Sequence, residues 1–129
     1  MGTIRKFEDL DCWQKARELC RFIFQIRKKI IAKKDYSLAD QMLNSSGSIM
    51  DNISEGFTRG GNKEFSHFLS ISRGSGGELQ SQLYRALDSE YITEEEFQTG
   101  YNLTDDTISL ISGLIKYLKG TNQKGYRFD

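Results

Sequence analysis

The residues of this chain that could support chemistry by their type and spacing are Asn52, Glu55 and Glu78. Asn52 and Glu55 are three positions apart, a spacing that places both side chains on one face of a helix. Glu78 belongs to the following helical segment and could meet them across a helix pair. Two carboxylates beside an amide could transfer a proton or hold a metal cation. The other interpretation, which we favour, is a structural polar cluster that fixes how two helices pair or caps exposed amides.

Few other residues suggest chemistry. Glu64 and His67 form one Glu-x-x-His motif, but a di-metal site in a helical bundle requires two such motifs. Cys12 and Cys20 fall in one predicted helix, about 12 Å apart along its axis, which is too far for a disulfide bond. We therefore predict buried thiols, no metal, no cofactor and no catalytic residues, so that the protein is not an enzyme.

Two glycine-rich stretches raise the question of a phosphate-binding loop. A P-loop follows a strand and has the pattern G-x-x-x-x-G-K-[ST]. Neither Gly56 to Gly61 nor Gly74 to Gly77 provides that pattern. The residues around Gly60 and Gly61 are instead predicted to connect two helices.

The elements that would position these residues are four amphipathic helices. Apolar residues recur with the helical period in four segments, 8–33, 37–57, 63–90 and 94–119. Long helices joined by short connections favour antiparallel neighbours. The sequence therefore predicts an all-α, up-and-down antiparallel four-helix bundle over residues 1–120, followed by a flexible C-terminal tail over residues 121–129.

Local signals refine these segments. The residues typical of helix N-termini are Ser37 with Asp40, Asn62, and Thr93 with Glu96. The run NSSGS at 44–48 favours close packing of a neighbouring helix over a break. The three glycines within RGSGGE at 73–78 predict a kink or a close contact.

The apolar residues of segment 8–33 cover an arc of about 160°, wider than the stripe of roughly 100° that a surface helix requires. Part of that arc is expected to face something beyond the intramolecular core, as in an oligomer.

The net charge is zero, but it is unevenly distributed. Residues 1–34 contain ten Lys/Arg and four Asp/Glu, whereas the rest of the chain contains eight and fourteen. A neutral chain has no overall attraction for nucleic acid, so any binding must come from a local basic stripe. The candidates are Arg17, Arg21 and Lys28 on one side of the first helix, together with Arg59, Lys63 and Arg73. The alternative is an ordinary solvated helix face.

No segment has the roughly 20 consecutive apolar residues of a membrane helix. The N-terminal residues MGTIRKFEDLD lack the apolar stretch of a signal peptide. We expect a cytoplasmic protein with no membrane contact.

Two runs carry a family resemblance. SIMDNISEGFTRGGNKEFSHFLSISRGSGGELQSQLYRAL at 48–87 and FEDLDCWQKARELC at 7–20 resemble the bacterial four-helix-bundle proteins encoded within intervening sequences of 23S ribosomal RNA genes. The same pattern is similar to the accessory variability determinant of diversity-generating retroelements. The resemblance covers roughly residues 7–119. It rests on the combination of motifs, such as Asn52-Ile53, Glu55-Gly56 and Arg73-Gly74-Ser75, because no one of them is specific alone.

The resemblance implies a non-enzymatic bundle that assembles into a homopentamer. It also implies an association with nucleic acid, RNA more than DNA, or with a protein partner. The sequence departs from the family pattern at three places. Met50 stands where relatives usually carry proline, Leu43 and Asn44 where they carry a basic pair, and Gly76 where an apolar residue is common. Losing the basic pair favours the alternative function, a protein-interaction scaffold or accessory subunit with no nucleic-acid binding.

Overall fold

A computed structural model describes residues 4–121 of the chain, and these form four long helices. A short 3-10 helix, η1 (Phe7–Asp9), precedes α1 (Asp11–Ala32), α2 (Tyr36–Arg59), α3 (Asn62–Asp88) and α4 (Glu94–Lys119). The described residues include no strand. The all-α class is therefore confirmed, and the helices begin and end within a few residues of the predicted ranges. The tail predicted beyond Thr121 lies outside the described residues.

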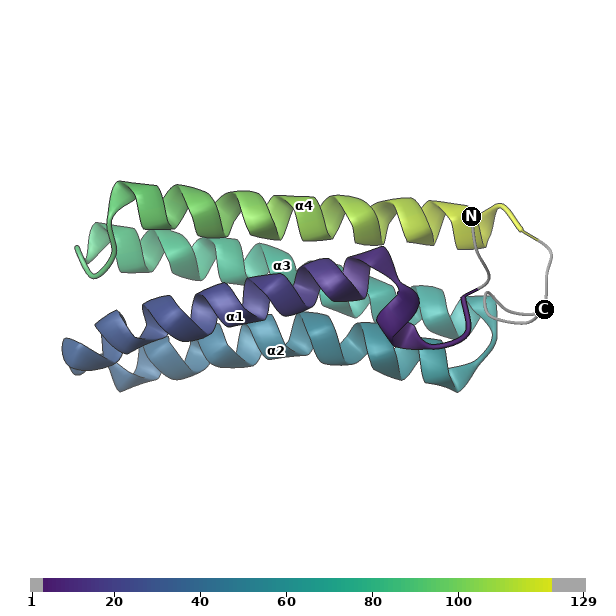
Figure 1. Cartoon of the computed structure of the whole chain (residues 1–129), viewed down its shortest axis with the longest axis horizontal. Coiled ribbons are helices and arrows are strands. Elements are labelled where there is room, and N and C mark those ends of the chain that lie inside the picture. Colours follow the sequence, from purple (N-terminus) through teal and green to yellow (C-terminus); the bar gives the residue numbers. More distant parts are fainter. Residues whose placement is uncertain (1–3, 122–129) are drawn as a thin grey trace.

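The four helices lie side by side, and consecutive helices run in opposite directions (Figure 1). α1 packs against α2 and α4, and α3 packs against the same two helices, so the bundle has four lateral helix pairs. Each helix turns its apolar face inward, as the helical periodicity predicts. The largest fully buried side chains form one core along the bundle axis: Leu19, Ile23, Ile30, Leu38, Met42, Ile49, Ile53, Phe65, Leu69, Leu79, Leu83 and Ile111.

Local hydrogen bonds set the start of two helices. The capping box predicted at the start of α4 is confirmed, because the Glu96 backbone N–H donates to Thr93 Oγ1 at 3.0 Å and the Thr93 N–H donates to Glu96 Oε1 at 2.9 Å. The start of α2 differs from the prediction. Its N-cap is Asp35, whose carboxylate accepts from the Leu38 N–H at 3.0 Å, and Ser37 already lies inside the helix.

The start of α3 also differs from the prediction. Its N-cap is Gly61, and Asn62 is the first helical residue. A glycine at this position provides no side-chain acceptor for the first helical amides.

Small residues allow the helices to approach closely. α2 is continuous through the NSSGS run and through Met50, and α3 is continuous through its glycines. A Cβ atom added to Gly76 would lie 2.8 Å from Ile108 Cγ1 on α4. The buried Ser72 hydroxyl donates to the Ile49 carbonyl oxygen across the α2–α3 contact at 2.9 Å. Gly76 therefore serves close helix packing, one of the two roles predicted for RGSGGE, whereas a Cβ atom added at Gly47, Gly74 or Gly77 would meet nothing within 4 Å.

Candidate nucleic-acid interface

The three residues predicted to form a polar cluster have separate partners along α2 and α3. Asn52 Nδ2 donates to the Ser48 carbonyl oxygen and to Ser48 Oγ, at 2.9 and 3.0 Å. Glu55 Oε2 accepts from Arg59 Nε at 2.9 Å on the same helix. Glu78 on α3 accepts from Ser45 Oγ at 3.4 Å. These contacts favour structural roles for all three residues, but they do not join them into one cluster.

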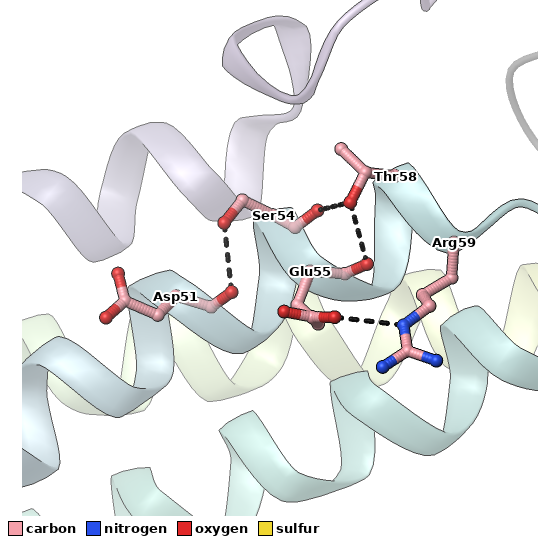
Figure 2. Close-up of polar contacts among 5 residues, drawn as sticks. All are labelled: Asp51, Ser54, Glu55, Thr58 and Arg59. Carbon is pink, nitrogen blue, oxygen red and sulfur yellow. Dashed lines mark hydrogen bonds and ion pairs between the residues drawn. The ribbon is translucent and has the colours of Figure 1, made fainter.

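Glu55 lies in the last turns of α2, where polar side chains bond mainly within the helix (Figure 2). Ser54 Oγ donates to the Asp51 carbonyl oxygen, and Thr58 Oγ1 donates to the carbonyl oxygens of Ser54 and Glu55. Figure 2 shows the Glu55 carboxylate pointing toward the guanidinium of Arg59. Since the ion pair joins residues four positions apart on one exposed helix face, it is a local surface feature.

The basic candidates on α1 border a groove between α1 and α2. The groove has a volume of about 350 Å³ and is lined by Arg17, Cys20, Arg21, Phe24, Gln25, Leu43, Ser46, Gly47 and Met50. Its apolar surface includes Phe24, which is 47% exposed, and Leu43, which is 37% exposed. The wide apolar arc predicted for the first helix includes Phe24, and its exposure agrees with the expectation that part of this arc faces away from the core. The α2 side of the groove was missed, because no sequence signal places its residues against α1.

Cations lie beside aromatic rings along the same helix. Lys28 Nζ lies 5.4 Å from the centroid of the Phe24 ring, and Arg17 Cζ lies 5.8 Å from that of Trp13. Both distances are within the range of cation–π attraction. Arg21 is exposed and borders the groove with Arg17. Positive charge beside an exposed aromatic face is the combination that proteins use to hold a phosphate backbone and stack a base.

The other three candidates do not belong to this α1 face. Arg59 on α2 lies over the ring of Phe68 on α3, at 5.1 Å, so it is at the α2–α3 side of the bundle. Arg73 Nη1 donates to Ser112 Oγ on α4 at 3.3 Å. Lys63 is exposed in the first turn of α3. The six residues are therefore spread over several sides of the bundle.

The two cysteines are free thiols, in agreement with the prediction from their spacing. Burial raises the pKa of the Cys12 thiol to about 12. Burial also raises the pKa of Cys20, whose thiol donates a hydrogen bond to the Ser46 carbonyl oxygen at 3.1 Å. A raised pKa leaves little thiolate at neutral pH, so neither group is activated as a nucleophile.

Over residues 4–121, no group of three or more His, Cys, Asp or Glu side chains is arranged to hold a metal ion. The ring of His67, the single histidine, packs edge to face against Phe68 with a centroid distance of 5.4 Å. None of the helices in the described part of the chain is sufficiently long and apolar to cross a membrane.

Architecture and side-chain arrangement together define a four-helix-bundle protein with a basic, aromatic α1 face. The family model of the 23S rRNA-intervening sequence protein matches residues 8–113, and the chain belongs to this family. The family resemblance of the sequence is thereby confirmed.

Comparison with solved structures agrees with this assignment. The fold is similar to that of a protein of unknown function from the S23 ribosomal protein family of Bacteroides thetaiotaomicron. The two share 25% sequence identity with a TM-score of 0.78, over 81% of this chain and 98% of the other. No curated protein matches the chain.

Proposed function

We propose that this chain is a non-enzymatic, cytoplasmic homopentamer that associates with RNA through the α1 face. The observation that carries the proposal is the row of exposed cations beside an exposed ring, formed by Arg17, Arg21, Phe24 and Lys28. Phosphate groups would pair with the cations, and an unpaired base would stack on Phe24. Single-stranded RNA offers both groups at once, since its bases are free to leave the stack.

Assembly into a pentamer would compensate for the small number of charges on one protomer. Three cations are few for a phosphate-binding surface, and the chain as a whole is neutral. Repeating the face around a ring makes the second and later contacts intramolecular, which raises the overall affinity. The pentamer itself is proposed from the family resemblance. The exposed rings of Tyr36, Tyr84 and Tyr117 supply apolar surface that subunit contacts could cover.

Light scattering on the purified, untagged protein tests both parts of the proposal, provided that the absorbance ratio at 260 and 280 nm is recorded across the same peak. The proposal predicts a pentamer with excess absorbance at 260 nm that is lost after a high-salt wash, because salt weakens phosphate contacts. A stable monomer would contradict the assembly. A pentamer that fails to bind single-stranded RNA at low salt would contradict the RNA association.

A second candidate function is a protein-interaction scaffold, and the apolar lining of the α1–α2 groove favours it. Phe24, Leu43, Met50 and the partly buried Cys20 together present an apolar surface that a partner's side chains could fill. The family resemblance of the sequence implies a basic residue at the position of Leu43, and its apolar side chain fits a protein partner better than a phosphate. A protein that co-purifies through high salt and nuclease treatment would support this function, whereas loss of the partner on either treatment would contradict it.

A further inference from the structure

A second cleft lies on another side of the bundle, between α2 and α3, and its lining is polar. Its volume is about 300 Å³, which is at the lower end for sites that bind small molecules. The lining residues are Gln41, Asn44, Ser45, Ser48, Ser75, Glu78 and Gln82. Among these seven, Glu78 carries the only formal charge. Arg85, next to the lining, donates from Nη1 to Gln41 Oε1 at 3.0 Å, so that acceptor is already engaged and Glu78 is the charged group of the lining itself.

Gln82 gives independent reason to expect an occupant. The residue lines the cleft, yet only 6% of its surface is exposed. Its Oε1 atom is buried and has no hydrogen-bond partner among the described residues. An unpaired buried acceptor costs stability, and a donor that reaches it removes that cost. Oε1 itself is buried, so it would reach a molecule in the cleft only after rotation about the terminal torsion, which is broad for glutamine.

The remaining polar groups of the cleft are already ordered. Asn52 donates to Ser48 Oγ at 3.0 Å, and the hydroxyl groups of Ser48 and Ser75 are 2.9 Å apart. Ser45 Oγ donates to Glu78 Oε1 at 3.4 Å. A hydroxyl oxygen has two lone pairs and a carboxylate has about four acceptor positions, so these bonds leave acceptor capacity on both kinds of group. The cleft therefore combines acceptors with one negative charge.

We propose that the α2–α3 cleft binds a primary ammonium group carried on a short aliphatic chain. An ammonium group has three N–H donors and no acceptor, which matches a lining of acceptors. Glu78 would supply the ion pair, and Gln82 Oε1 and a serine hydroxyl would accept the remaining donors. This site is separate from the basic α1 face and does not depend on RNA binding.

Titration of the ¹⁵N-labelled protein with 1,4-diaminobutane tests the proposal, with 1,4-butanediol as the neutral probe of the same chain length. We expect saturable shifts of the amide signals of Ser45, Ser75 and Gln82 with the diamine. The diol should bind about tenfold more weakly or less, because it cannot form the ion pair. Equal affinity for the two probes, or shifts that spread over the surface without saturation, would overturn the proposal.

Two substitutions in α3 separate a specific site from general attraction to carboxylates. Glu78→Gln should weaken diamine binding about tenfold or more, since it removes the charged partner while keeping a similar shape. Glu64→Gln removes an exposed carboxylate in the first turn of α3, outside the cleft, and should leave the affinity unchanged. The dispersion of the amide spectrum shows whether each variant is folded. Equal effects of the two substitutions would show that the diamine binds by net charge alone.

Gln82→Met tests the buried acceptor itself. If Gln82 accepts a hydrogen bond from the bound ammonium group, this variant should bind the diamine several-fold more weakly while remaining folded. An unchanged affinity in a folded Gln82→Met variant would contradict the proposal that Gln82 accepts a hydrogen bond from the bound ammonium group.

Discussion

Gly56 of α2 lies so close to α3 that a Cβ atom added to it would be 2.7 Å from Phe68 Cβ. The same atom would be 3.0 Å from the ring of Phe65 and 3.3 Å from its carbonyl oxygen. Because the first carbon of a side chain and a backbone oxygen cannot move independently of α3, Gly56→Ala must push the two helices apart. We predict a loss of about 1–3 kcal/mol in the free energy of unfolding, measured by urea denaturation.

Gly77 provides the matched control for Gly56. It also lies inside a helix, but a Cβ atom there would meet nothing within 4 Å. Gly77→Ala should therefore raise the free energy of unfolding by up to about 1 kcal/mol, through helix propensity alone. If both glycine substitutions stabilised the protein, the close contact at Gly56 would be contradicted.

Lys34, between α1 and α2, adopts a left-handed backbone conformation with φ of 66°. Glycine adopts this conformation without the Cβ clash that a lysine suffers, although it loses more entropy on folding. Lys34→Gly should therefore stabilise the protein by about 0.5 kcal/mol, whereas Lys34→Val should destabilise it by about 1 kcal/mol or more. Thermal unfolding should give a higher midpoint for Lys34→Gly than for wild type and a lower midpoint for Lys34→Val. Equal midpoints for the two variants would contradict this prediction.

Glu96 predicts a pH dependence of stability. Burial acts to raise the pKa of Glu96, but hydrogen bonds from Lys29 and Thr93 outweigh it and lower the pKa below its ordinary value of 4.5. Because the pKa is lower in the folded state, the stabilisation is complete above about pH 4.5 and is lost as the pH falls through the folded-state pKa.

The ion pair between Lys29 and Glu96, at 2.7 Å, links α1 to α4 and is partly exposed. Glu96→Gln keeps a side chain suited to the capping box but removes this charge pair. At pH 7 we expect a loss of about 0.5–1 kcal/mol in the free energy of unfolding. The difference from wild type should shrink as the pH falls below 4.5, as measured by urea denaturation at several pH values. A difference that stays constant down to the acid transition would contradict the assignment.

The two thiols should differ in reactivity. Cys12 is buried, with a pKa of about 12, whereas Cys20 lines the α1–α2 groove. With a disulfide reagent at pH 8, Cys20 should react slowly and Cys12 only when the protein unfolds, because reaction requires an accessible thiolate. Cys12→Ala and Cys20→Ala variants assign the two phases. Rapid reaction of both thiols in the native protein would contradict the burial of Cys12.

The architecture could be predicted from periodicity because apolar residues recur on the buried face of every helix, even though polar residues such as Ser72 and Thr104 are buried there too. The capping box at Thr93 and Glu96 was predictable because both partners lie within one turn. The cap of α2 was not. Asp35 also accepts a hydrogen bond at 3.0 Å from the hydroxyl of Tyr91, which lies in the connection between α3 and α4, and this contact depends on the fold.

The candidate site was less predictable than the fold. Arg17, Arg21 and Lys28 could be placed together because their spacing within one helix fixes their direction. Residues on different helices could not be placed relative to them, since the side of the bundle on which Arg59 and Arg73 lie depends on helix packing. The α1–α2 groove could not be predicted for the same reason, because only the fold brings its α2 lining, including Leu43, next to α1.

The measurement that tests the central claim most directly is the salt dependence of RNA binding. Binding is measured by the fluorescence anisotropy of a labelled single-stranded RNA. The triple variant Arg17→Gln, Arg21→Gln, Lys28→Gln is compared with Lys33→Gln, Lys116→Gln, Lys119→Gln, which removes as many charges from exposed positions outside the α1 face. Each phosphate contact on a single strand contributes about 0.7 to the slope of log affinity against log salt.

The account predicts that wild type and the second triple variant bind with similar, steep salt dependence. The first triple variant should bind more weakly, with a slope reduced by about 2 for each protomer engaged. Equal binding by the two triple variants, or no binding by wild type at low salt, would contradict the assignment of the α1 face as an RNA-binding surface.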